Sequence, residues 1–158
     1  MIKKIVSGGQ TGVDRAGLDA AMQHKIPHGG WCPRGRRAED GTIDAGYQLV
    51  ETASHDYSQR TEYNVTDSDG TLILNLGRLD GGTAFTARVA ESILKPCLIL
   101  DLAGPVDTAA VIAWLTVNNI QILNIAGPRE NKCPGIYHKA RNELNRILSS
   151  IHNSQMEF

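Results

Sequence analysis

The chain has 158 residues, of which 41% are hydrophobic and 21% are charged, and its formal net charge is -1. This length fits one domain with a sizeable buried core, and the composition is that of an ordinary water-soluble protein. The nearly neutral charge excludes a general attraction to nucleic acid or membranes, so an anion must be recognised by locally placed arginines and backbone donors. No apolar run approaches a membrane-spanning length, and the three cysteines lack the spacing of a disulfide framework or a zinc site. We therefore expect a cytoplasmic protein with reduced thiols.

The N-terminal stretch predicts a strand, a glycine-rich turn and a helix. Residues 1–6 are typical of a short buried strand, and the small residues within 13–23 suit a helix packed against a sheet. Glycines in the intervening turn, Ser7-Gly8-Gly9-Gln10-Thr11-Gly12, let backbone N–H groups approach a ligand, and the helix N-terminus adds a partial positive charge. This arrangement favours a phosphate, although a tight turn without a ligand is the alternative. The turn lacks the glycine spacing of NAD-binding proteins and the lysine of a Walker loop, so both classes are disfavoured.

Strands and helices alternate along the rest of the chain. We expect strands over 26–32, 47–52, 71–76, 97–102 and 120–125, and helices over 56–65, 84–94, 108–117 and 134–151. Residues 33–41 form a charged loop, and Asp107 is a suitable N-cap for the helix that follows it. This order predicts an α/β fold: one doubly wound, mostly parallel, Rossmann-like sheet with helices on both faces, over residues 1–152. Residues 153–158 are expected to form a flexible tail.

Two further glycine turns follow predicted strands, at residues 77–83 and 126–129. Because strand-to-helix turns of a parallel sheet lie at one edge, the three turns are expected to share one crevice and one ligand. Threonine hydroxyls, glycine amides and arginines would contact phosphate oxygens, and Trp31 would either stack on a planar ring or simply be packed. Asp14 either complements the helix dipole or accepts hydrogen bonds from a heterocycle, and Asn75 would lie at the crevice floor. The residues expected to bind this ligand or cofactor are Gly8, Gly9, Gln10, Thr11, Gly12, Asp14, Arg15, Trp31, Arg36, Glu39, Arg60, Asn75, Gly81, Gly82, Thr83, Gly127 and Arg129.

The sequence predicts neither a catalytic residue nor a metal site of the protein's own. The histidines do not cluster with cysteines at metal-ligand spacing, and no nucleophile elbow or kinase signature is present. Cys32 and Cys133 lie near the ends of predicted strands.

Several motifs resemble those of the molybdenum cofactor carrier proteins. They are Ser7-Gly8-Gly9-Gln10-Thr11-Gly12-Val13-Asp14-Arg15, Pro27-His28-Gly29-Gly30-Trp31-Cys32-Pro33, Ala38-Glu39-Asp40-Gly41, residues 57–65, Gly81-Gly82-Thr83 and Ala126-Gly127-Pro128-Arg129, and together they span essentially the whole chain. That family looks like a branch of a Rossmann-like superfamily that includes the lysine decarboxylase-like phosphoribohydrolases and the DNA-uptake protein DprA. The resemblance implies a phosphorylated pterin-like or nucleotide-like ligand, a homo-oligomer, and molybdoenzymes as partners. In a carrier the dithiolene of the pterin would hold the metal, and the resemblance leaves Cys32 and Cys133 as additional ligands.

One position departs from the phosphoribohydrolase pattern. That pattern has a catalytic glutamate three residues after its Gly-Thr threonine, and here the position is occupied by Thr86. Hydrolase activity is therefore not carried over, and a binding role is favoured over an enzyme. Two functions stay open: binding and carriage of the molybdenum cofactor (molybdopterin), and binding of a nucleotide or ADP-ribose derivative, as a sensor or an N-glycoside hydrolase-like enzyme. DNA binding through residues 34–37 ranks third, because one short basic loop in a nearly neutral chain is weak evidence.

Overall fold

The centre of the protein is a five-stranded sheet with the strand order β2-β1-β9-β7-β8. The computed structural model describes residues 1–157. Neighbouring strands of this sheet are all parallel. The strands are β1 (Lys4–Val6), β2 (His28–Gly29), β7 (Gly70–Asn75), β8 (Cys97–Asp101) and β9 (Ile122–Ala126). Every residue of β7 is buried, as its continuous apolar run predicts for a central strand of a parallel sheet.

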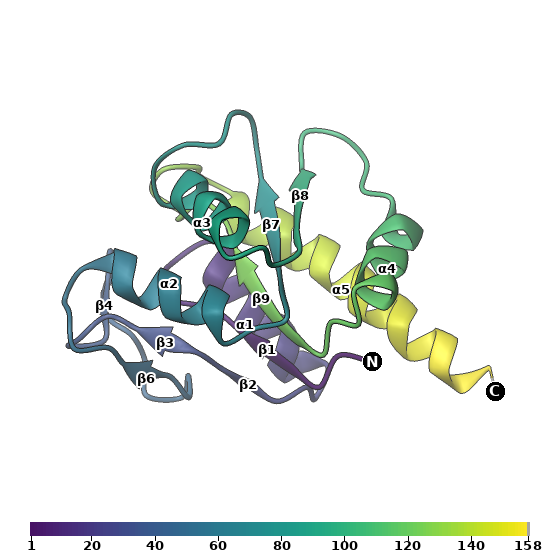
Figure 1. The fold of residues 1–158 in the computed structure, drawn as a ribbon, viewed down its shortest axis with the longest axis horizontal. Coiled ribbons are helices and arrows are strands. Elements are labelled where there is room, and N and C mark those ends of the chain that lie inside the picture. Colours follow the sequence, from purple (N-terminus) through teal and green to yellow (C-terminus); the bar gives the residue numbers. More distant parts are fainter. Residues whose placement is uncertain (158) are drawn as a thin grey trace.

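Five helices cover the two faces of the sheet. They are α1 (Val13–Gln23), α2 (Tyr57–Thr66), α3 (Gly81–Ser92), α4 (Thr108–Val117) and α5 (Ile136–Met156). Figure 1 shows α2 and α3 in front of the sheet and α1 and α5 behind it. Helix α5 packs against both α1 and α4, whereas α2 packs against α3. Right-handed crossovers explain this arrangement. The connection from β1 to β2, which contains α1, and the connection from β7 to β8, which contains α3, move toward opposite edges of the sheet, so the two helices cover opposite faces. The predicted Rossmann-like α/β fold is confirmed.

The last strand of the chain lies in the middle of the sheet. β9 pairs with β1 through Ile5 and Leu123, and with β7 through Leu72 and Ile125. The direction of winding therefore reverses at these three strands, with β2 on one side and β8 on the other. Open α/β sheets bind their ligands in the crevice beyond the carboxyl ends of the strands at such a reversal.

The segment predicted as a strand over residues 26–32 is divided in two. Gly30 separates β2 from β3 (Trp31–Cys32), and its φ of 125° lies in a region that side chains rarely adopt. An added Cβ there would lie 2.4 Å from the backbone oxygen of Ser7. Beyond this bend β3 leaves the central sheet and pairs with β6 (Val50–Glu51), which lies within the predicted strand 47–52. The charged loop contains a small antiparallel hairpin of β4 (Arg37–Ala38) and β5 (Gly41–Thr42).

The helix boundaries differ most from expectation where glycine or weak packing obscures them. Helix α3 begins at Gly81 and not at residue 84, because the glycine pair that resembles a turn forms its first turn. Helix α5 continues beyond residue 151 to Met156, and Phe158 lies outside the described residues. Helix α4 has the predicted bounds, and Oδ1 of Asp107 accepts the cap bond from the Ala110 amide at 3.1 Å. None of the helices within residues 1–157 is long and apolar enough to cross a membrane.

Candidate functional site

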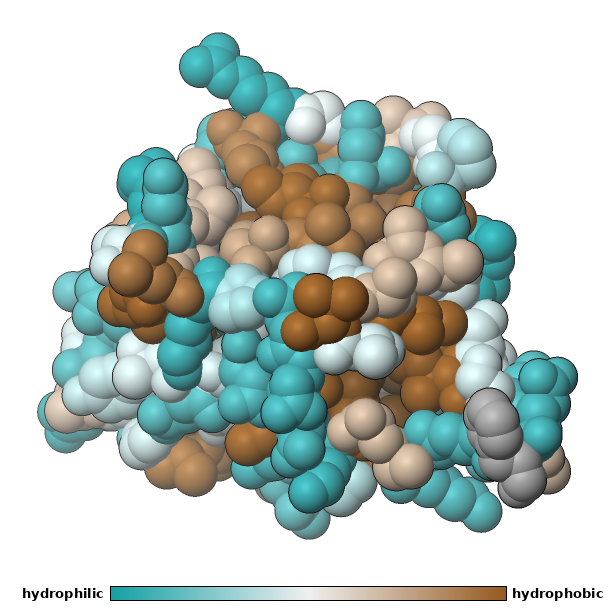
Figure 2. Space-filling model, turned by 45° about the vertical axis from the view of Figure 1, so that its right-hand side comes forward, coloured by the Kyte–Doolittle hydropathy of each residue, from teal (hydrophilic) through white to brown (hydrophobic). Residues whose placement is uncertain are grey.

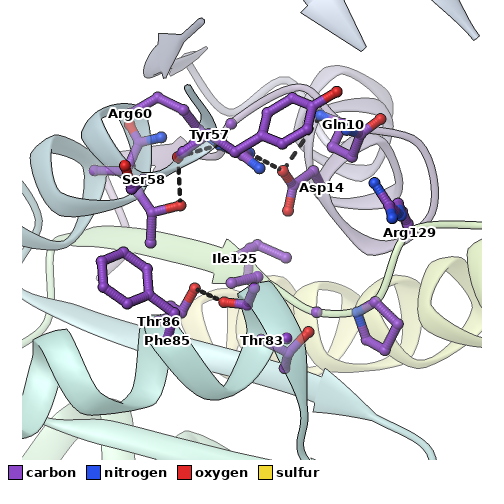
Figure 3. A pocket seen from close by; sticks show the side chains of 18 of the residues that line it. Gln10, Asp14, Tyr57, Ser58, Arg60, Thr83, Phe85, Thr86, Ile125 and Arg129 are labelled. Carbon is purple, nitrogen blue, oxygen red and sulfur yellow. Dashed lines mark hydrogen bonds and ion pairs between the residues drawn. The ribbon is translucent and has the colours of Figure 1, made fainter. Parts of the chain in front are cut away.

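A cleft of about 390 Å³ opens at the carboxyl edge of the sheet, beside the reversal of strand order. Its walls come from the turn after β1, a largely half-buried side of α2, the N-terminal half of α3 and the end of β9 (Figure 3). The lining residues are Gly8, Gln10, Asp14, Tyr57, Ser58, Arg60, Thr61, Asn64, Asp80, Gly81, Gly82, Thr83, Phe85, Thr86, Asn124, Ile125, Ala126, Gly127, Pro128, Arg129 and Lys132. All three predicted glycine turns therefore contribute to a single cleft.

One end of the cleft is formed by the N-terminus of α3. An ideal Cβ built on Gly82 meets no described atom within 4 Å, so the backbone here faces open space. The first N–H groups of a helix lack partners within the helix, and the helix dipole makes this end positive. One cation stands beside it: Nζ of Lys132 would lie 2.8 Å from a Cβ added to Gly81, and it is 2.7 Å from Oδ1 of Asp80. Arg129, whose Nε lies 3.4 Å from Oε2 of Glu39, lines the same cleft. This end of the cleft is suited to an anion.

The opposite wall holds an ion pair with little solvent contact. Oδ2 of Asp14 accepts hydrogen bonds from Nη1 of Arg60 at 2.7 Å and from the Gln10 amide at 3.3 Å. The side chains of Arg60 and Asp14 are 13% and 8% exposed. Burial raises the pKa of Asp14, and the neighbouring Arg60 opposes this shift. Gly8 makes room for the guanidinium, since an added Cβ there would lie 1.7 Å from Nη1 of Arg60.

Most backbone donors in and just after the first glycine turn, those of Gly9, Gln10, Thr11 and Val13, are bonded to protein groups. The amide of Thr11 donates to Oε1 of Gln10 at 3.0 Å, and the amide of Val13 donates to the carbonyl of Pro128 at 3.2 Å. Gly12, whose φ is 78°, packs so closely on the third glycine turn that a Cβ would lie 2.4 Å from the Pro128 oxygen. Gly9 likewise lies under Leu49. These contacts leave the N-terminus of α3 as the more accessible anion donor of the cleft.

Comparison with known proteins identifies the family. The profile of the family described as "Circularly permutated YpsA SLOG family" matches residues 5–148. The chain belongs to this family. A crystal structure at 1.45 Å resolution of a "Putative molybdenum carrier protein" from Syntrophus aciditrophicus SB is similar to it, with 51% sequence identity and a TM-score of 0.88, over 93% of this chain and 94% of that one. A comparison with curated proteins found no match.

Four of the expected ligand residues line a shallower hollow beside the cleft: Thr11, Gly12, Arg15 and Glu39. Oε1 of Glu39 accepts from the hydroxyl of Thr11 and from the Asn131 amide, the latter at 3.0 Å. Arg15 holds Asp40 through two bonds of 2.5 and 2.8 Å, and its hydrogen bond lowers the pKa of Asp40. In this family member these side chains tie the first glycine turn to the charged loop and to the segment after β9.

Besides Gly9, three other expected residues lie away from the cleft. The indole N–H of Trp31 donates to Asp67 at 2.8 Å, so the ring packs against α2 and its end. Arg36 donates to four backbone carbonyls of the loop that follows β5. The buried Asn75 donates to the Gly77 carbonyl at 2.9 Å and shapes the turn after β7. Each of these residues has a structural partner that explains its position.

The cleft also contains side chains that the sequence analysis did not assign to it. Tyr57 and Phe85 supply its aromatic surface. Lys132 supplies a cation beside the start of α3. Tyr57 lies in segment 57–65, one of the segments that resemble the carrier family, and that resemblance was the signal that could have identified it. Thr86, which occupies the position of the phosphoribohydrolase acid, lines the cleft and donates its hydroxyl to the Gly82 carbonyl at 2.9 Å.

The cysteines lie in packed surroundings. Cys32 is fully buried beside Ala38 and Ile43, and burial raises the pKa of its thiol. Cys133 is half-buried against the main core. Among residues 1–157, His, Cys, Asp and Glu side chains do not gather in a group of three that could hold a metal ion.

Proposed function

We propose that this protein binds and carries the molybdenum cofactor, with the cofactor's terminal phosphate at the N-terminus of α3 and its pterin beside Asp14. The observation that carries the proposal is the open backbone at Gly82, with Lys132 beside it, in a cleft that Arg129 also lines and whose other wall presents a carboxylate. Helix N-termini and arginines are common phosphate ligands in proteins. The similar protein from Syntrophus, which is called a molybdenum carrier, supports the same choice of ligand.

The size and chemistry of the cleft fit a phosphorylated pterin. Its volume of about 390 Å³ lies within the range of roughly 300–1,000 Å³ found for small-molecule sites. A pterin is planar and carries N–H donors, which suit the aromatic side chain of Phe85 and the carboxylate of Asp14. When bound, the cofactor brings the dithiolene sulfurs that hold molybdenum. The residues of this chain bind the phosphate and orient the ring.

The proposal includes the setting in which a carrier acts. We place the protein in the cytoplasm as a homo-oligomer that delivers its cofactor to molybdoenzymes. Leu94, Ile99 and Val117 are exposed by 91%, 44% and 83%. Leu94 lies in the loop after α3, Ile99 in the edge strand β8 and Val117 at the end of α4. Figure 2 shows several hydrophobic residues on the side of the molecule that carries β8 and α4. Apolar patches of this kind favour subunit contacts.

The test is native mass spectrometry of the protein purified without added metal or nucleotide. Molybdenum analysis and pterin fluorescence are measured on the material released by denaturation. We expect molybdenum and a fluorescent pterin in the same mass-shifted species. A bound nucleotide would replace this proposal with the nucleotide-binding function, and protein that neither carries nor retains added molybdopterin would refute it.

A further inference from the structure

The Asp14 carboxylate uses its two oxygens differently. In the described part of the chain, the hydrogen bonds to this group both go to Oδ2, from Arg60 and from the Gln10 amide. Figure 3 shows the second oxygen of Asp14 on the side of the cavity. The carboxylate thus combines one oxygen that is bonded to a guanidinium with one that faces the ligand space.

Apart from its ion pair with Asp14, the guanidinium of Arg60 makes few contacts that would hold it in place. Its Nε donates to the Tyr57 carbonyl of its own helix at 3.2 Å, and its guanidinium lies 5.3 Å from the centre of the Tyr57 ring. Its Nη1 rests against Gly8, which has no side chain to hold it. Rotation about the side-chain bonds of Arg60 therefore moves the guanidinium off Asp14 without moving α2.

We propose that Asp14 selects ligands whose ring has a cyclic guanidine edge, as the 2-amino-4-oxo ring of a pterin or a guanine has, and that Arg60 occupies this position until the ligand displaces it. Such an edge donates two parallel N–H bonds, and these need both oxygens of one carboxylate. Because Arg60 already uses Oδ2, the ligand must replace it. The exchange substitutes one guanidine-type donor for another. This inference rests on the proposed function, since it uses the same cleft.

The arrangement predicts strong discrimination against rings that lack the 2-amino group. A 2-oxo group at this position would place an oxygen against the carboxylate and leave a buried acceptor without its partner. Sites built to bond a ligand N–H reject analogues without it far more strongly than apolar pockets reject a missing methylene. We expect pterin to bind at least about 30-fold more tightly than lumazine, which differs by a 2-oxo in place of the 2-amino group.

The experiment measures dissociation constants of pterin and lumazine, and of GMP and IMP, by calorimetry and fluorescence on the full chain. In Asp14→Asn we expect the preference for the 2-amino compound to fall below about threefold, since an amide cannot accept both N–H bonds. Arg60→Gln and Gly8→Ala should keep the preference and tighten pterin binding by about fivefold or more, because each frees Oδ2. Gly8→Ala does so with every charge retained, because the methyl group would overlap Nη1 of Arg60, and the backbone of Gly8 lies outside the left-handed region. Gly104→Ala, which lies outside the cleft and has open space around its added Cβ, is the control and should change neither quantity.

The outcomes are separable from those of the carrier proposal. Equal affinity for pterin and lumazine, no measurable binding of either, or full discrimination in Asp14→Asn would overturn the selection by Asp14. Weaker pterin binding in both Arg60→Gln and Gly8→Ala would overturn displacement. If Asp14→Asn does not fold, the wild-type and Gly8→Ala measurements still decide. Retained molybdenum cofactor without discrimination leaves the carrier standing and removes this inference, whereas discrimination with GMP preferred over pterin keeps the inference and assigns the site to a guanine nucleotide.

Discussion

Gly127, at the end of β9, provides a quantitative test of how tightly the floor of the cleft is packed. An ideal Cβ at this position lies 2.3 Å from the Leu74 carbonyl oxygen and 2.6 and 2.8 Å from two side-chain carbons of Val13. These atoms belong to the central strand β7 and to the first residue of α1, so neither neighbour can swing aside. Overpacking of a core costs about 1–3 kcal/mol, and contact with backbone places Gly127→Ala at about 3 kcal/mol. For a protein of this size that corresponds to a fall in Tm of roughly 6–12 °C.

The assay is thermal and urea unfolding followed by circular dichroism. Gly104→Ala is the matched control, because no described atom lies within 4 Å of its added Cβ, and its free energy of unfolding should change by less than about 0.5 kcal/mol. The same substitution is thus expected to lower the free energy of unfolding strongly at Gly127 and to leave it nearly unchanged at Gly104. A Tm for Gly127→Ala within about 2 °C of the wild type would refute the close packing of β9 against β7 and α1.

Three further predictions concern the anion site, a helix cap and an ion pair. Gly82→Asp should weaken binding of inorganic phosphate by about tenfold or more relative to Gly82→Asn in calorimetry, while leaving Tm unchanged or higher, because a carboxylate in the first turn of α3 repels anions and favours the helix. Asp107→Ala should lower the free energy of unfolding by about 1 kcal/mol in urea denaturation through loss of the α4 cap bond, and an unchanged value would show that the cap is unimportant. Because Arg15 lowers the pKa of Asp40 below its ordinary 3.8, the stabilisation by this pair should be present above about pH 4 and lost as pH falls through the folded-state pKa. NMR titration of Asp40 should show this low pKa, and Arg15→Gln should return it to about 3.8; no change would contradict the assigned cause.

The sequence was sufficient for elements whose pattern is local. The apolar run of β7 predicted a central strand, and Asp107 correctly marked the start of α4. It was insufficient where a glycine decided between two paths: Gly30 turned one predicted strand into β2 and β3, which belong to different sheets. The deciding contact there is with Ser7, which is distant in the sequence.

The candidate site shows the same division. That three glycine turns meet follows from the parallel sheet and could be predicted. That the space beside Gly8 is occupied could not be predicted, because the guanidinium there belongs to Arg60, which is 46 residues further along the chain than its partner Asp14. Trp31 and Arg36 were plausible ligand residues by type, but their partners, Asp67 and the carbonyls of a loop, are set by tertiary packing.

The central position of β9 also affects how the sheet is assembled during synthesis. The pairs β1 with β2 and β7 with β8 are translated first, yet in the finished sheet they are joined only through β9. Until residues 122–126 leave the ribosome, β1 and β7 each present an unpaired edge, and pairing such as that of Lys4 with Ile122 spans most of the chain. Long-range pairing of this kind slows folding, and open strand edges invite association with other chains. β9, which completes the ligand cleft, is thus also the strand that covers the exposed edges of β1 and β7 and protects them from pairing with other chains.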